Sequence, residues 1–389
     1  MFPARIRLFS LLGFRVSIDI SWFFLAFYLV LTLSTRYFPE QVPHLGLRAY
    51  IAMAVIGAAG LFLSIILHEL AHAVVARGFG LPIGGITLFI FGGVAELKQE
   101  PANPRSEFWV AIVGPVASIS IAAGCFVAAI GAEAAGLGGI EAVLAFLTIT
   151  NTVLALFNLV PAFPLDGGRV LRSLIWWRTG NLMRATRIAC WFGTGFGALL
   201  VLSGFALFVS GDRLGGSWQV LIGLFLAAAA SQARNQTATA LSLKDATVAD
   251  LMERAPLSAP PGITVAELVN DYLYRLNRKF VIIAGDGQAI GYVGPEQIKK
   301  VPQSQWNETY ARAIAASFTH ETVVSPAAPA IEALRKLQSN GTGHLTVLEG
   351  SKLAGTVSEA NFVNFLSVRE ELACIGAGPR EAGTARTGG

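Results

Sequence analysis

Two histidines and a glutamate lie inside a long apolar run of the chain. His68, Glu69 and His72 are flanked by the apolar segments 58–67 and 73–76. Residues i and i+4 share a face of a helix, so both imidazoles can bind one metal ion while Glu69 lies beside them as a base. Ionisable groups in hydrocarbon cost several kcal/mol unless they are paired or hydrated. The alternative is a pair of polar residues that face a water-filled cavity or another helix.

The composition places these residues in a membrane protein. The chain has 389 residues, of which 53% are hydrophobic and 14% charged, whereas soluble domains carry about 25% charge. The apolar excess lies before residue 236, and after Leu243 the composition becomes that of a soluble domain. We therefore predict a polytopic α-helical membrane protein with a soluble α/β part. The three cysteines form no Cys-x-x-Cys pair, so no disulfide framework or thiolate metal site is indicated.

Six segments are apolar enough to be candidate spans, each needing about 20 residues. They are 17–33, 49–76, 108–131, 140–160, 188–209 and 218–230. With the N-terminus inside, twelve basic residues fall on the cytoplasmic side: Arg5, Arg7, Arg15, Arg77, Lys98, Arg105, Arg169, Arg172, Arg178, Arg184, Arg187 and Arg234. The outer side holds three: Arg36, Arg48 and Arg213. This bias predicts a multi-pass protein of the cell membrane, with an uncleaved cytoplasmic N-terminus and a cytoplasmic soluble part. The net charge of +4 is explained by these loops, and we expect a lipid bilayer and no nucleic acid as partner.

A short segment between the second and third spans has the pattern of strands. Residues 81–97 are rich in β-branched and aromatic residues and are interrupted by two Gly pairs, which predicts a β-hairpin or small sheet. Non-helical backbone at membrane depth is tolerated only against protein or water. The segment is either an edge that pairs with an extended peptide or a structural re-entrant hairpin.

A catalytic zinc site usually has three protein ligands, so a third one must be found. The remaining histidines lie in an outer loop or in the soluble part. Asp166 follows the fourth span on a segment broken by Pro161 and Pro164, on the same side as His68 and His72. From the residues alone, Asp166 is either this ligand or the N-cap of a following helix. Asn158 is either a donor to an oxyanion or a brace for the broken helix end.

These residues resemble the site-2 protease family of intramembrane zinc metalloproteases. The resemblance rests on His68-Glu69-x-x-His72 and on the run Asn158-x-x-Pro-x-x-Pro-Leu-Asp166-Gly-Gly, and it covers about residues 1–236. It implies that His68, His72 and Asp166 bind one Zn²⁺ per chain and that Glu69 is the catalytic base. The run 91–94 and Gly114-Pro115 are similar to that family too.

The resemblance also suggests secondary site residues and a kind of substrate. Gly92, Gly93 and Asn158 are candidates for contacts with the substrate or its oxyanion. Some relatives carry Asn where this chain has Ser118, which leaves a polar role there open. The implied function is endopeptidase cleavage within or near the span of a single-span, membrane-anchored regulatory protein. The alternatives are a metal transporter and an inactive relative that binds membrane partners.

The soluble part contains two similar units of about 60 residues. Each has the order strand, helix, strand, strand, helix, and the two resemble a tandem pair of CBS domains. We predict a membrane domain at 1–236, a linker at 237–247, CBS domains at 248–302 and 303–374, and a disordered tail at 375–389.

The role of this pair is open from sequence. Such pairs often bind adenine nucleotides through a Gly-x-x-Ser/Thr-x-x-Asp run, which here offers Ser358 and, in place of the aspartate, Asn361. The first unit lacks both residues. The pair is therefore expected either to bind a regulatory nucleotide or to serve a structural role, such as formation of a homodimer.

Overall fold

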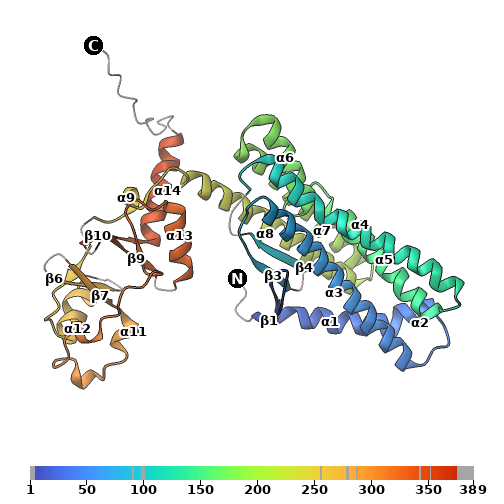
Figure 1. Ribbon diagram of the computed structural model, residues 1–389, viewed down its shortest axis with the longest axis horizontal. Coiled ribbons are helices and arrows are strands. Elements are labelled where there is room, and N and C mark those ends of the chain that lie inside the picture. Colours follow the sequence, from blue (N-terminus) through green and yellow to red (C-terminus); the bar gives the residue numbers. More distant parts are fainter. Residues whose placement is uncertain are drawn as a thin grey trace, which may run out of the picture. The chain divides into compact units, whose positions relative to one another are not determined.

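The protein consists of two compact units, residues 1–237 and 238–389 (Figure 1). The computed structural model describes residues 5–89, 92–97, 101–254, 256–276, 280–285, 288–340, 343–350 and 352–374. The expected tail at 375–389 lies outside the described residues.

Five helices in the described part of the chain are long and apolar enough to cross a membrane. They are α3 (Leu47–Gly78), α4 (Pro104–Ala134), α5 (Gly138–Asn158), α7 (Leu182–Val209) and α8 (Arg213–Ser242). Six spans were expected. The first of them differs because residues 17–19 belong to a strand, so that helix α1 (Ser21–Thr32) has only 12 residues. Helical backbone continues from it through η1 (Leu33–Tyr37) and α2 (Phe38–Gln41).

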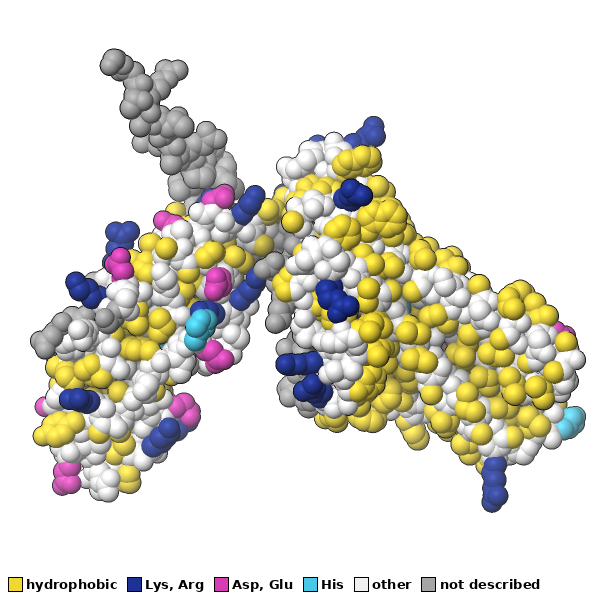
Figure 2. Space-filling view, viewed as in Figure 1, with side chains coloured by type: hydrophobic (Ala, Val, Ile, Leu, Met, Phe, Trp, Pro, Cys, Tyr) yellow, Lys and Arg dark blue, Asp and Glu magenta, His cyan; other side chains and the backbone are white. Residues whose placement is uncertain are grey.

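The outer surface of these helices is apolar. Val127, Leu202 and Val209 are about 70% exposed, and Figure 2 shows hydrophobic side chains over much of the face of this unit that it displays. Such a surface is unfavourable in water and suits the hydrocarbon of a bilayer.

A four-stranded sheet packs against α3 in the first unit. Its order is β1 (Arg5–Leu11), β2 (Phe14–Asp19), β3 (Ile83–Phe89) and β4 (Gly92–Leu97). The expected hairpin is confirmed as the antiparallel pair β3–β4, in which β4 forms one edge of the sheet. One face of the sheet is buried against the turns of α3 around the two histidines; its core residues are Val16, Ile18, Ile66, Leu70, Ile86 and Leu88.

Strands β1 and β2 were not predicted. Residues 14–19 alternate between buried and more exposed positions, and the turn at Leu12 and Gly13 has positive φ values of 50° and 86°. This is the pattern of a two-residue β-hairpin. The hairpin was not recognised in the sequence because residues 17–19 are also the start of the apolar segment 17–33, which fits a membrane span.

The second unit is built around a six-stranded sheet with two similar halves. Its order is β5 (Ser258–Ala259), β6 (Val281–Gly285), β7 (Gln288–Val293), β10 (Lys352–Ser358), β9 (His344–Glu349) and β8 (Val323–Val324). The described part of this unit also contains the helical elements α9 (Val248–Leu251), α10 (Val265–Glu267), η2 (Leu268–Tyr274), α11 (Pro295–Ile298), η3 (Gln303–Gln305), α12 (Ala311–Ile314), α13 (Ala330–Ser339) and α14 (Glu359–Cys374).

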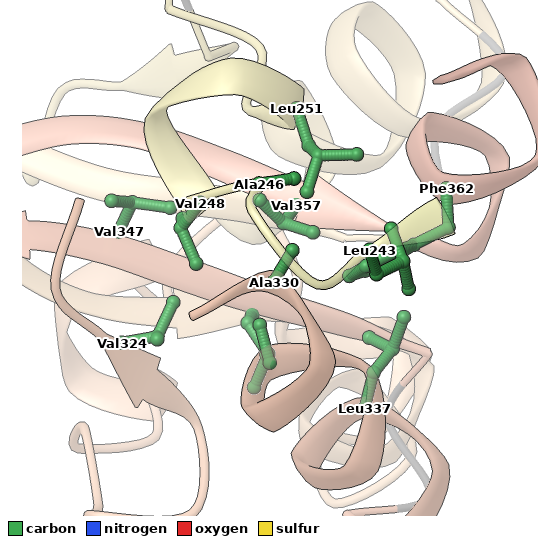
Figure 3. Close-up of a cluster of buried hydrophobic side chains, with 12 residues drawn as sticks. Leu243, Ala246, Val248, Leu251, Val324, Ala330, Leu337, Val347, Val357 and Phe362 are labelled. Atoms are coloured by element: carbon green, nitrogen blue, oxygen red, sulfur yellow. The ribbon is translucent and has the colours of Figure 1, made fainter. Parts of the chain in front are cut away.

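The two halves exchange their opening segments. Leu243, Val248 and Leu251 are buried in the core formed by α13, β9 and β10 (Figure 3), whereas Ala311 is buried in the core of the preceding half. The segment 237–247, expected as a linker, therefore continues α8 as far as Ser242 and then enters a hydrophobic core.

Candidate metal centre

Three side chains from two helices meet at one point of the membrane unit. His68 and His72 lie on successive turns of α3, and Asp166 is the first residue of α6 (Asp166–Thr179). Asp166 Oδ2 lies 3.1 Å from His68 Nε2 and 3.2 Å from His72 Nε2, and the two Nε2 atoms are 3.2 Å apart. All three residues are at least 92% buried. The structure thus brings together the three residues that the sequence proposes as metal ligands.

The triangle of ligand atoms has the size that a tetrahedral zinc site requires. Zn²⁺ bound at about 2.0–2.1 Å from each ligand separates neighbouring ligand atoms by about 3.3–3.4 Å. The observed separations of 3.1–3.2 Å are close to this value. Asp166 takes no part in helix capping, since the N-cap of α6 is Leu165 and no side chain caps that helix end. The residues present therefore fit a zinc ion.

Residues of helix α4 contact the Nδ1 atoms of both imidazole rings. His72 Nδ1 donates to the carbonyl oxygen of Val110 at 2.5 Å, and His68 Nδ1 lies 2.9 Å from Ser118 Oγ. The Val110 carbonyl can only accept, so His72 carries its proton on Nδ1 and leaves the Nε2 lone pair for a metal. The Ser118 hydroxyl can accept from His68 Nδ1 in the same way, which is the direction that a metal on His68 Nε2 requires. Ser118 thus has the polar role that the sequence left open.

A glycine permits this close approach. A Cβ atom at Gly114 would lie 2.6 Å from His68 Nε2 and would overlap the ring of His72. The sequence identified Gly114 only through its resemblance to a family motif. The role of the Val110 carbonyl could not be predicted, because every residue has a backbone carbonyl and the residue type does not show which one accepts a hydrogen bond.

The segment that carries Asp166 is fixed by backbone contacts. Phe163 N donates to the carbonyl oxygen of Ala189 on α7 at 3.2 Å, and a Cβ at Gly193 would overlap the carbonyl oxygen of Phe163. Side chains at Gly167 or Gly168 would overlap the backbone of residues 159–163. The peptide bond between Phe163 and Pro164 is cis. The position of Asp166 is therefore determined by an irregular segment packed onto a neighbouring helix.

Glu69 lies beside the edge strand of the sheet. It is half-buried on α3, and a Cβ at Gly93 of β4 would come within 2.7 Å of Glu69 Cγ. Gly92 has a φ of +130°, and a Cβ there would meet nothing within 4 Å. Asn158 is the last residue of α5, is half-buried and makes no side-chain hydrogen bond within the described part of the chain. The bracing role considered for Asn158 is thus not seen.

Fold and site together define a polytopic membrane protein with a buried His-His-Asp centre and an adjacent glutamate. The model of peptidase family M50 matches residues 56–134 and 127–202, and the CBS domain model matches residues 316–368. The chain belongs to peptidase family M50, whose members of this kind are zinc metalloendopeptidases of the site-2 protease type.

Several relatives are similar over most of their length. A protein of Synechocystis named "Putative zinc metalloprotease sll0528" is 32% identical over 373 residues, which cover 93% of this chain and 95% of that protein. Rip3 of Mycobacterium tuberculosis, with a name of the same form, is 33% identical and covers 80% of each chain. The solved site-2 protease of Methanocaldococcus jannaschii is 26% identical, covering 59% of this chain and 95% of that one, with a TM-score of 0.41.

The family assignment favours the peptidase over the transporter and the inactive relative. It also establishes zinc as the metal of this class of enzyme and a lipid environment for the first unit. His68, Glu69, His72 and Asp166, which an inactive relative would be expected to lose in part, are all present.

Proposed function

We propose that His68, His72 and Asp166 bind one Zn²⁺ per chain and that Glu69 transfers protons during peptide hydrolysis. The observation that carries the proposal is the buried triangle of ligand atoms, 3.1–3.2 Å on each side. A bound Zn²⁺ supplies a Lewis acid that polarises a carbonyl and acidifies water. Glu69 accepts a proton from the attacking water and delivers it to the amide nitrogen of the leaving peptide.

The substrate is a membrane-anchored protein with a single span, bound in extended form along β4. A helical span hides its amide bonds, so it must unwind before it can be cut. Strand β4 is an edge of its sheet, and an edge pairs with an extended peptide through backbone hydrogen bonds. The contact between Gly93 and Glu69 supports this site, since a peptide paired with β4 would pass close to the base. Gly92 offers an unobstructed backbone beside it, and Asn158 remains a candidate donor to the oxyanion.

The charge distribution supports a cytoplasmic N-terminus and soluble unit. Arg172 must be removed from the twelve basic residues of the cytoplasmic side, because it is buried in an ion pair and is not available to a lipid headgroup. Eleven then oppose three, and the positive-inside rule gives the same orientation.

The CBS pair acts as a structural or dimerising module rather than as a nucleotide sensor. Asn361 Oδ1 accepts from Ser358 N at 2.8 Å and from Ser358 Oγ at 2.7 Å, so it caps the start of α14. Gln297 Oε1 accepts from Gly294 N in the same way in the first half. The cavity lined by Ser358, Thr356 and Phe280 has about 40 Å³, enough for a few waters and too small for an adenine nucleotide. A larger and more open hollow of about 350 Å³ lies between His320 and Lys336, and neither Ser358 nor Asn361 lines it. Calorimetric titration with ATP and AMP tests this assignment, and binding at micromolar concentration would contradict it.

The proposed mechanism is tested by E69Q in the purified full-length protein. We expect one zinc per chain as in the wild type and a loss of cleavage of a single-span reporter by at least about 10²-fold, the contribution of a general base. E133Q is the matched control, since Glu133 is an exposed glutamate on α4. Unchanged cleavage by E69Q would refute the role of Glu69, and zinc flux through vesicles would indicate transport.

A further inference from the structure

A buried ion pair joins α4 and α6 outside the metal centre. Glu107 is fully buried and Arg172 is 4% exposed. Arg172 Nε donates to Glu107 Oε1 at 2.5 Å, and Arg172 Nη2 contacts the same oxygen. The guanidinium also lies over the ring of Phe163, 5.1 Å from its centre. Glu107 Oε2 has no hydrogen-bond partner among the described residues.

Stability alone does not account for such a pair. Apolar residues of similar volume often replace a buried ion pair at no cost or with a gain in stability. What an ion pair provides is one defined geometry, because the planar guanidinium meets a carboxylate in few arrangements.

Glu107 belongs to the face of α4 that supports the imidazoles. Glu107, Val110, Gly114 and Ser118 follow one another at intervals of three, four and four residues, so they lie along one side of the helix. The last three touch or approach His68 and His72. The ion pair therefore extends the same contact surface by one turn toward the start of α4.

The distance along the helix axis between the ion pair and the metal centre is similar on α4 and α6. Glu107 and Gly114 are seven residues apart on α4, about 10.5 Å along its axis, and Asp166 and Arg172 are six apart on α6, about 9 Å. At one end of these two intervals Glu107 pairs with Arg172. At the other end, Gly114 and Asp166 both lie beside the Nε2 atoms of the histidines. A slip of α6 by one turn would move Asp166 by about 5.4 Å, farther than the 3.1 Å that separates it from His68 Nε2.

We propose that Glu107 and Arg172 are positioning residues that fix the axial register of α6 on α4 and thereby hold Asp166 at the third metal position. The proposal rests on the proposed function, because it takes His68, His72 and Asp166 as the ligands. Neither Glu107 nor Arg172 is one of the proposed ligands; they act through the placement of Asp166.

The test compares metal binding with stability in the full chain. R172K keeps the charge and loses the planar fork, whereas the double variant E107Q/R172M removes both charges. Metal affinity is measured by competition with a chelator, ligand geometry by the visible spectrum of the Co²⁺-loaded protein, and stability by thermal unfolding. We expect both variants to bind metal about 10–100-fold more weakly, as when supports of metal ligands are lost, with an altered Co²⁺ spectrum. The double variant should unfold near the wild-type temperature.

Two further variants separate the possible failures. E40Q disrupts the exposed pair of Arg36 and Glu40 and should leave metal binding unchanged. D166A should lose the metal; wild-type affinity in D166A would refute the ligand set itself. If D166A loses the metal while R172K and the double variant keep wild-type affinity and spectrum, the positioning role is overturned and the metal centre stands. If the double variant does not fold, R172K alone decides between these outcomes.

Discussion

At the scale of single residues, three hydrogen-bond acceptors converge on one point of the membrane unit. The Val110 carbonyl accepts from His72 Nδ1, which leaves the His72 Nε2 lone pair beside Asp166 Oδ2, and His68 Nε2 reaches the same oxygen when Ser118 Oγ accepts from its Nδ1. Acceptors 3.1–3.2 Å apart repel one another unless a cation or a proton lies between them. Their buried arrangement is thus prepared for a positive ion, and small changes around the rings should be felt in metal binding.

Replacement of Gly114 by Ala tests how closely α4 must approach the rings. The added methyl group would overlap His72 and lie 2.6 Å from His68 Nε2, so at least one imidazole must leave its position. We expect G114A to lose most of its zinc and its peptidase activity, with zinc content measured by mass spectrometry. G124A on the same helix is the control, since a Cβ there meets nothing within 4 Å. Equal zinc content in both variants would contradict this close approach of α4.

Most of the proposed site could be predicted from residue types, and its supports could not. His68, Glu69, His72 and Asp166 carry side chains whose chemistry and spacing by themselves indicate a metal centre. Val110 and Ala189 contribute carbonyl oxygens, and Gly193 contributes only the absence of a side chain. Such contributions depend on how helices pack and have no signature in composition or spacing.

At the scale of elements, helix α7 supports the segment that carries Asp166. G193A would drive a methyl group into the carbonyl of Phe163, which must then move together with the start of α6. We expect weaker zinc binding, by about 10–100-fold, as for other supports of metal ligands. G195A, two residues along and with open space around its Cβ, should bind zinc as the wild type does. Chelator competition measures both, and wild-type affinity in G193A would show that this contact does not position Asp166.

Two short helices of the second unit begin with capping boxes that depend on ionised carboxylates. Hydrogen bonds from the backbone and side chain of Thr247 lower the pKa of Asp250, and those from Thr264 lower the pKa of Glu267. A lowered pKa in the folded state contributes stability that is present above the ordinary carboxyl pKa and is lost as the pH falls through the folded-state pKa.

The stability of the second unit should therefore decrease on acidification below about pH 4, where carboxyl groups begin to protonate. Urea unfolding of residues 238–374 at pH 7 and at lower pH measures the effect. The variant D250N/E267Q should show a weaker pH dependence, because its caps carry no titratable group. An equally steep dependence in this variant would assign the effect to other groups.

The elements themselves were predicted where length or a strong pattern marked them. The long apolar helices and the β3–β4 hairpin were predicted, whereas β1 and β2 were missed because their alternation runs into an apolar helix. The end of the expected linker was also missed, since Leu243 and Ala246 are too few to form a periodic pattern and become core residues only through packing with α13 and β10.

At the scale of the whole molecule, sequence repeats and folding cores do not coincide in the second unit. The first repeat was predicted to begin at residue 248, yet Leu243 is fully buried in the core of the second repeat and Ala330 N donates to the carbonyl oxygen of Ala246 at 2.9 Å.

A fragment of residues 248–374 should therefore be less stable than one of residues 238–374. The free energy of unfolding should fall by at least about 2–5 kcal/mol, the cost of removing one large aliphatic side chain from a core. L243A in the longer fragment should reproduce most of this loss, while L241A, at a position that is 37% exposed, should have a small effect. Urea unfolding of the four proteins measures these differences. Equal stability of the two fragments would mean that the exchanged segment adds nothing to the core, and that the repeats fold within their own sequence limits.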